Sequence, residues 1–259
     1  MTTAVERTHR RVEHVMGMPV SLAIRGRHAV DAAGAAAWDE AVALLREADR
    51  TFSIYRPDSV VSRLGRGELN PADCPPEVAE VLGLGALAEQ QSDSAFAVRR
   101  AGPDGAVVLD PSGVVKGWAV ERAAAPLREL AETDFCLSGG GDLLCRTADP
   151  DGNPWRIGIE DPRDPRRVLA VVPLASGAVA TSGIAHRGQH LVDARTGRPP
   201  SGIASVTVLA DSLTWADIDA TAAWVQGQSA AAWLATRPGR TGLVVWADGS
   251  TTTVTGPVA

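Results

Sequence analysis

The chain has 259 residues, of which 45% are hydrophobic and 22% charged, so it can bury a sizeable core and does not resemble a disordered protein. Its formal net charge of −6 argues against a partner nucleic acid, whose phosphate backbone requires a basic surface. The three cysteines, Cys74, Cys136 and Cys145, have no CxxC spacing. They fit neither a disulfide framework nor a thiolate zinc site, and they favour a reducing compartment.

The N-terminal segment MTTAVERTHRRVEHV carries charges throughout and contains no apolar stretch of signal-peptide length. The sequence also lacks any run of about 18 apolar residues, so we expect no membrane span. Together these features predict a soluble cytoplasmic protein.

Helices and strands are predicted from the spacing of apolar residues and from turn signals. Apolar residues three and four apart indicate helices, and short extended runs between turn residues indicate an antiparallel meander. Pro76 suits a first helical turn, and Asp248–Gly249 is a two-residue hairpin signal. In chain order we expect a strand (15–25), helices (31–52 and 76–91), a strand and turn (106–113), a helix (116–130), a hairpin with a glycine turn (135–146), extended runs (154–162, 168–174, 178–183), a strand end and turn (190–197), a strand (204–210), a helix (213–227) and a final hairpin (242–255).

In the second half of the chain, strands mostly follow strands and helices appear singly. This order indicates an α+β fold rather than regular β-α alternation. The composition does not shift along the chain and no long linker interrupts it. We therefore predict one compact domain over residues 1–259, with mostly antiparallel sheets flanked by helices.

The most informative stretch is WADIDATAAW, residues 215–224. Asp217 and Thr221 are four residues apart, so on a helix their oxygens share one face, and such oxygens are the ligands that magnesium prefers. The alternative is an acidic first turn that complements the helix dipole. Asp219 lies on another face, where we expect a solvated carboxylate.

Two further segments suit a phosphate or nucleotide. The glycine run 139–141 allows close approach of the backbone, and Asp142 adds a carboxylate; a plain hairpin turn is the alternative. The run matches neither a Walker loop nor a dinucleotide fingerprint. Lys116, at the start of a predicted helix, can meet phosphate beside free helix amides, or it can lie along its own helix.

Polar residues are concentrated in residues 180–199. Ser182, His190 and Asp193 would suit a hydrolase triad, but the sequence lacks the G-x-S-x-G nucleophile elbow. A histidine near a metal-bound phosphate can instead act as a general base toward an incoming hydroxyl. The alternative for His190 is a partly buried histidine that is hydrogen-bonded within the sheet.

Taken in order, these segments resemble the ApbE flavin transferase family over residues 16 to 227. The resemblance rests on MGMPVSL, FSIYRPDSVVSRL, DPSGVVKGWAVERA, LSGGGD, PWRIGI, AVATSG, HLVDARTG and WADIDATA. It implies an α+β, T-fold-related architecture that binds FAD in an elongated cleft, with Mg2+ at the pyrophosphate.

The resemblance also implies roles for individual residues. Asp217 and Thr221 would be side-chain metal ligands, and the backbone carbonyls of Gly139 and Ala220 would add oxygens. Asp217 and His190 would be the catalytic residues, with His190 as the base. The positions implied beside the flavin or the nucleotide are Met16, Met18, Tyr55, Ser59, Lys116, Gly140, Gly141, Asp142, Thr181, Ser182 and Gly183.

The activity that the resemblance implies is Mg2+-dependent transfer of FMN from FAD to a threonine or serine hydroxyl of an acceptor flavoprotein, with release of AMP. With water in place of the acceptor, the same site would be an FAD pyrophosphatase. A non-catalytic FAD-binding protein is the third alternative. Ala97 stands where the family commonly has an acid, so we expect a more open cleft or a different choice of acceptor.

Overall fold

The computed structural model describes residues 7–101, 107–184 and 192–258. Its largest unit, among these residues, is an antiparallel sheet of eight strands. The edge strands come from opposite ends of the chain. From one edge to the other the strands are β1 (His9–Val15), β2 (Met18–Gly26), β5 (Thr133–Gly139), β6 (Asp142–Arg146), β9 (Ser176–Gly183), β10 (Ile203–Ala210), β11 (Thr241–Trp246) and β12 (Thr251–Thr255).

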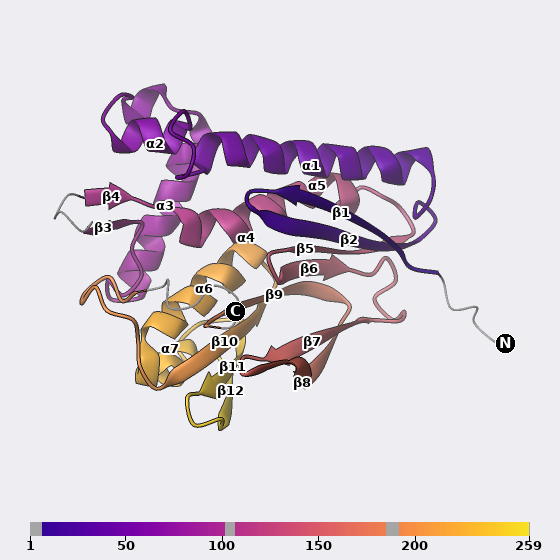
Figure 1. Ribbon diagram of the computed structural model, residues 1–259. Helices are drawn as coiled ribbons and strands as arrows, with labels where there is room; N and C mark the ends of the chain where they lie inside the picture. The colour runs from indigo at the N-terminus through magenta and orange to yellow at the C-terminus, as the bar shows by residue number, and fades with distance from the viewer. Residues whose placement is uncertain (1–6, 102–106, 185–191, 259) are drawn as a thin grey trace.

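Helices cover one face of this sheet in two layers. The inner layer contains α4 (Ser112–Ala123) and α6 (Leu213–Val225), which pack on each other, and α6 also packs on β9 and β10. The long helix α1 (Ala32–Phe52) lies outside α4 (Figure 1). The remaining helical elements described are α2 (Val60–Gly65), α3 (Pro76–Gln91), α5 (Ala125–Arg128), α7 (Ala230–Leu234) and the 3-10 turns η1 (Pro71–Asp73) and η2 (Gly227–Ser229).

Every residue of α6 except Trp215 is buried. The helix is rich in alanine and carries apolar side chains on all sides, which is the pattern of a helix enclosed by other elements. Its surroundings are the sheet on one side and α4 on another. Polar side chains on α6 are therefore held inside the protein rather than in solvent.

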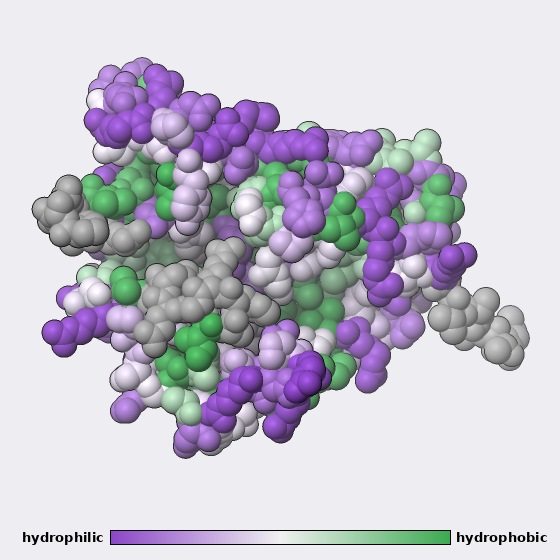
Figure 2. All heavy atoms as spheres, in the orientation of Figure 1, coloured by the Kyte–Doolittle hydropathy of each residue, from purple (hydrophilic) through white to green (hydrophobic). Residues whose placement is uncertain are grey.

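Two hairpins lie outside the large sheet in the described part of the chain. One pairs β3 (Arg99–Ala101) with β4 (Val107–Leu109), and the other pairs β7 (Trp155–Asp161) with β8 (Asp164–Leu174). In Figure 1, α1 lies at the top of the molecule and the β7–β8 hairpin at the lower right. Figure 2 shows hydrophilic residues over α1 and α2 and some apolar ones close to the β3–β4 hairpin.

The predicted α+β class and the mostly antiparallel sheet are confirmed. The expected strand at 15–25 is instead part of a hairpin, because Met16 and Gly17 both have positive φ (56° and 69°), the pattern of a two-residue turn. The expected helix at 116–130 is wrong at both ends. It begins earlier, at Ser112, and a second helix starts at Ala125, since Pro126 cannot continue the hydrogen-bond ladder.

Candidate functional site

The start of α6 is fixed by side chains that bind its free backbone groups. Ser212 accepts a hydrogen bond from the N–H of Trp215 (3.3 Å). Glu121 of α4 accepts hydrogen bonds from Ser212 Oγ (2.8 Å), Thr214 N (2.8 Å) and Thr214 Oγ1 (2.6 Å). A carboxylate at a helix N-terminus also complements the helix dipole. These contacts join α4 to the start of α6 and thereby fix the position of Asp217 and Thr221 relative to α4.

A glycine allows α4 and α6 to come close together. A Cβ at Gly117 would lie 2.8 Å from the Cβ of Asp217 and 2.8 Å from the carbonyl oxygen of Leu213, which is closer than real side chains allow. The Gly117 N–H instead donates a hydrogen bond to Asp217 Oδ2 (2.9 Å). The missing side chain is thus what places the Asp217 carboxylate against α4.

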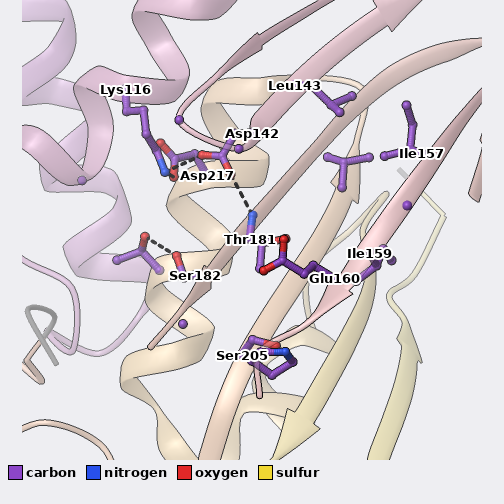
Figure 3. A pocket seen from close by; sticks show the side chains of 18 of the residues that line it. Lys116, Asp142, Leu143, Ile157, Ile159, Glu160, Thr181, Ser182, Ser205 and Asp217 are labelled. Atoms are coloured by element: carbon purple, nitrogen blue, oxygen red, sulfur yellow. Dashed lines mark hydrogen bonds and ion pairs between the residues drawn. The ribbon is translucent and has the colours of Figure 1, made fainter. Parts of the chain in front are cut away.

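Lys116 lies between the carboxylates of Asp142 and Asp217 (Figure 3). Its Nζ is 3.1 Å from Asp217 Oδ1 and directly contacts Asp142 Oδ2. Both aspartates are 1% exposed, so water solvates neither carboxylate. Among the described side chains, the single ammonium of Lys116 contacts both buried carboxylates, and the cluster keeps an excess of negative charge.

This charge balance is reflected in the pKa values of the cluster. Burial raises the pKa of Asp217 to about 7, with Lys116 opposing the rise and Asp142 adding to it. Burial acting alone would lower the pKa of Lys116, but Asp217 and Asp142 outweigh it and raise that pKa above its ordinary value. Lys116 therefore stays protonated, and Asp217 is the carboxylate whose pKa rises because positive charge is in short supply.

The sheet opens at this cluster because β6 and β9 separate. Their pairing ends at Leu143 and Val179, and beyond that point Asp142 Oδ1 accepts a hydrogen bond from the N–H of Thr181 (2.9 Å). The turn before Asp142 consists of Gly140 and Gly141, both with positive φ, as a two-residue hairpin turn requires. The side chain of Asp142 thus takes the place of a backbone partner where the two strands diverge.

A cavity of ≈ 260 Å³ occupies this opening, and we call it the smaller cavity. One side is polar, with Ser182 Oγ 3.0 Å from Thr221 Oγ1. The other side includes the apolar Ile157 and Ile159 of β7, and Glu160 of the same strand lies beside Thr181 (Figure 3). The lining includes Ser112, Gly113, Lys116, Gly140, Gly141, Asp142, Leu143, Ile157, Ile159, Thr181, Ser182, Gly183, Asp217 and Thr221.

A second cavity of ≈ 850 Å³, the larger cavity, adjoins the first. Ser112, Gly113, Lys116 and Thr221 line both, so the two spaces meet at the lysine. Tyr55 stands at the larger cavity with 91% of its surface exposed. The lining includes Met16, Gly17, Met18, Phe52, Tyr55, Ala95, Phe96, Ala97, Asp110, Val115, Val192 and Val225.

Three residues that the sequence predicted at the site line neither cavity, as far as the described residues define the two spaces. Ser59 is the N-cap of α2 and accepts a hydrogen bond from the N–H of Ser62 (3.1 Å). Gly139 lies against Val120, and Ala220 is buried within α6. The predicted base, His190, lies outside the described residues.

The expectation of a solvated Asp219 is wrong. Asp219 is 1% exposed, and its carboxylate pairs with Arg237 (3.2 Å) and Arg240 (2.7 Å). The reason is the burial of α6 on nearly all sides, which leaves no solvent-facing side for a charged residue. Two guanidinium groups stabilise a carboxylate that would otherwise be costly to bury.

Some residues of the site were missed by sequence reasoning. Ser112 and Gly113 are the first two residues of α4 and line both cavities; the sequence indicated only a turn at residues 110–113. The contact between Gly117 and Asp217 joins residues 100 apart. No spacing rule connects positions so distant, so this contact had no sequence signal.

Comparisons with known proteins agree on one family. The model of the ApbE family matches residues 16–102 and 97–244. Two curated relatives named FAD:protein FMN transferase are similar, one from Vibrio cholerae (35% identical over 130 residues) and one from Rhodobacter capsulatus (36% over 172 residues). These matches cover 46% and 61% of this chain but only 39% and 32% of the relatives, so the chain spans well under two thirds of their length.

Solved structures match over nearly the whole chain. The flavinyl transferase ApbE of Pseudomonas stutzeri superposes with a TM-score of 0.80 at 25% identity, covering 98% of this chain and 96% of that one. The flavin transferase ApbE of Vibrio cholerae superposes with a TM-score of 0.80 at 22% identity, covering 97% of both chains. The second match concerns the fold alone.

Proposed function

The chain belongs to the ApbE family, and on that premise we propose that it is a Mg2+-dependent transferase that moves FMN from FAD onto a threonine or serine hydroxyl of an acceptor flavoprotein, releasing AMP. The observation that carries the proposal is the meeting of two cavities at Lys116 and Thr221, beside Asp217. A dinucleotide has two ring systems joined by a pyrophosphate, and two cavities joined at a polar, charged cluster suit that shape. The names of the curated relatives support the same activity.

The larger cavity is the proposed flavin site. It is lined by Met16, Met18 and Tyr55, and sulfur and aromatic side chains make favourable contacts with a flat ring. The smaller cavity, where Ile157 and Ile159 offer apolar contacts, is the proposed site for the AMP half. Lys116 and the polar groups around it would then face the pyrophosphate.

The residues at the junction fit a magnesium ion by their chemistry and charge. Asp217 and Thr221 offer carboxylate and hydroxyl oxygens, the hard ligands that magnesium prefers, and the cluster carries an excess of buried negative charge. Among the described residues no three His, Cys, Asp or Glu side chains gather into a metal site. Magnesium commonly takes one or two carboxylates together with phosphate oxygens and water, so Asp217 and Thr221 are the side chains proposed to hold it.

The carbonyls of Gly139 and Ala220 remain predicted ligands. When bound, the ion would neutralise oxygens of the pyrophosphate and charge on the departing AMP. Lys116 would add a positive charge at the same place and orient the phosphates.

The proposed reaction is a displacement at the phosphorus of the FMN half. The acceptor hydroxyl oxygen forms a bond to this phosphorus, and the bond from the phosphorus to the bridging oxygen breaks. AMP leaves with the bridging oxygen. The hydroxyl proton passes to a base, for which His190 is the residue proposed from the sequence.

The test is incubation of the purified protein with FAD, Mg2+ and an acceptor flavoprotein domain from the same source, followed by intact-mass measurement. We expect the acceptor to gain the mass of FMN minus water, and EDTA to prevent the gain. The matched control is an acceptor with its threonine or serine replaced by alanine, which must remain unmodified.

Other outcomes of the same experiment would contradict the transferase. Release of AMP and free FMN without a mass gain, with several acceptor domains supplied, would indicate an FAD pyrophosphatase. Saturable FAD binding without any turnover would indicate a flavin-binding protein.

A further inference from the structure

Lys116 is the only lysine in the sequence, which contains 24 arginines. The two residue types differ physically. Arginine carries a broad planar fork, whereas lysine carries a compact ammonium on a flexible stem of four carbons. A small rotatable charge can therefore move between neighbouring partners where a guanidinium would need a larger rearrangement.

The surroundings of Lys116 give its ammonium two places to lie. On one side are the carboxylates of Asp142 and Asp217, both 1% exposed. On the other side are the two cavities, which Lys116 itself lines. Its side chain keeps 21% of its surface exposed, so it is not enclosed by the carboxylates.

Both oxygens of Asp217 have partners within the protein. Lys116 Nζ is 3.1 Å from Oδ1, and the N–H of Gly117 donates to Oδ2 (2.9 Å). The Gly117 amide belongs to a rigid helix, so the ammonium is the partner that can withdraw. A divalent cation that takes an oxygen of Asp217 would also repel the ammonium by like charge.

We propose that Lys116 is an exchangeable counter-ion: without a bound metal its ammonium offsets part of the charge of Asp142 and Asp217, and a divalent cation bound at Asp217 displaces it toward the cavities. There it would face the phosphates of the nucleotide. The metal and the nucleotide in this inference rest on the proposed function, whereas the counter-ion role rests on the contacts of Lys116. Before the metal binds, the single ammonium offsets only part of the charge of the two carboxylates, and the divalent cation then takes over that role.

The first test is amine labelling, which the composition makes unusually specific. Reductive methylation with formaldehyde and a borane can modify only Lys116 and the N-terminal amine, and the latter serves as internal control. We compare labelling in EDTA with labelling at a Mg2+ concentration that calorimetry shows to be saturating, without FAD. We expect Lys116 labelling to rise severalfold with Mg2+, because an ammonium displaced from its two carboxylate partners lies in the cavities, where the reagent can reach it.

The second test is the variant Lys116→Met, which removes the competing charge and keeps the apolar stem. We expect it to melt at a lower temperature than the wild type in EDTA and to bind Mg2+ at least about tenfold more tightly by calorimetry, because no ammonium must first be displaced. Arg122→Met is the matched control. It removes a cation from the same helix, where Arg122 forms exposed pairs with Glu77 and Glu80, and it should bind Mg2+ as the wild type does.

Several outcomes would overturn the exchange. They are labelling that is unchanged or lower with saturating Mg2+, Mg2+ binding by Lys116→Met that is equal to or weaker than that of the wild type, and absence of Mg2+ binding by both proteins. If Lys116→Met does not fold even with Mg2+, the labelling of the wild type alone tests the exchange.

These results are separable from the transfer assay. FMN transfer with unchanged Lys116 labelling would overturn the counter-ion exchange and leave the proposed function standing. Increased labelling without transfer to any acceptor would support the counter-ion exchange and contradict the proposed transferase activity.

Discussion

Asp217 and Asp219 are two residues apart on α6 and meet opposite surroundings. Asp217 lines the smaller cavity and shares one ammonium with Asp142. Asp219 is paired with the guanidinium groups of Arg237 and Arg240. A carboxylate that lacks a full counter-charge is open to a cation, whereas one with two partners is already satisfied. The two positions therefore offer a direct comparison between a site residue and a structural one.

We expect Asp217→Asn to keep the fold and to lower Mg2+-dependent FMN transfer by at least about 100-fold. Mutation of a residue that only hydrogen-bonds to a metal ligand can already lower activity by up to about 100-fold. Asp219→Asn should instead lower the free energy of unfolding by about 3–5 kcal/mol, because it leaves buried arginine charges without a partner. Urea unfolding and the intact-mass transfer assay measure the two effects. Unchanged transfer in Asp217→Asn would remove this residue from the site.

Ser59 was predicted beside the flavin, but its hydroxyl caps α2. We expect Ser59→Ala to lower the free energy of unfolding by about 1 kcal/mol, the usual effect of losing such a cap, and to leave FAD affinity unchanged. Tyr55→Ala is the matched comparison, because Tyr55 lines the larger cavity and is 91% exposed. It should weaken FAD binding, measured by fluorescence titration, without loss of stability. Weaker FAD binding in Ser59→Ala would place its hydroxyl at the flavin after all.

At the scale of elements, the site depends on how closely α4 and α6 approach. Gly117 provides the approach, and Glu121 joins the two helices at the start of α6. Asp217 and Thr221 come from α6, and Lys116 comes from α4. Because the site residues come from both helices, the distance between α4 and α6 determines the geometry of the site.

We therefore expect Gly117→Ala to lower the free energy of unfolding by about 1–3 kcal/mol through overpacking and to impair FMN transfer by moving Asp217. The matched control is Gly83→Ala on α3, where an added Cβ meets nothing within 4 Å. That change should raise stability by about 0.5–1 kcal/mol, the difference in helix propensity between the two residues. Thermal unfolding and the transfer assay compare them. Full transfer activity in Gly117→Ala would show that the helices can separate without harm.

At the scale of the whole molecule, the large sheet unites both ends of the chain. β1 forms one of its edges and β12 the other, and the inner helices pack on strands between them. Removing either end would expose the next strand and the apolar face of the sheet. This arrangement supports the prediction of a single domain over residues 1–259.

We expect the protein to unfold in urea in one cooperative transition. The seven tryptophans are distributed from Trp38 to Trp246, over α1, α4, α6, α7, β7 and β11, so their fluorescence reports on most layers of the fold. The fluorescence midpoint should coincide with the midpoint of far-UV circular dichroism. Two separated transitions would indicate two domains instead of one.

Features set by neighbouring residues could be predicted from the sequence. The period of apolar residues located most helices and strands, and the order of strands indicated the α+β class. The four-residue spacing of Asp217 and Thr221, and the glycine turn before Asp142, followed from helix and hairpin geometry. These features repeat with the fixed geometry of the backbone, and they need no knowledge of what packs against them.

Features set by packing could not be predicted in this way. The contacts of Lys116 with Asp217, the burial of Asp219 and the meeting of the two cavities all depend on which faces of α4, α6 and the sheet come together. A carboxylate on a helix has the same local sequence whether it meets water, an ammonium or two guanidinium groups. Its charge state and its role are settled only when distant segments enclose it, because desolvation and counter-charges act through space rather than along the chain.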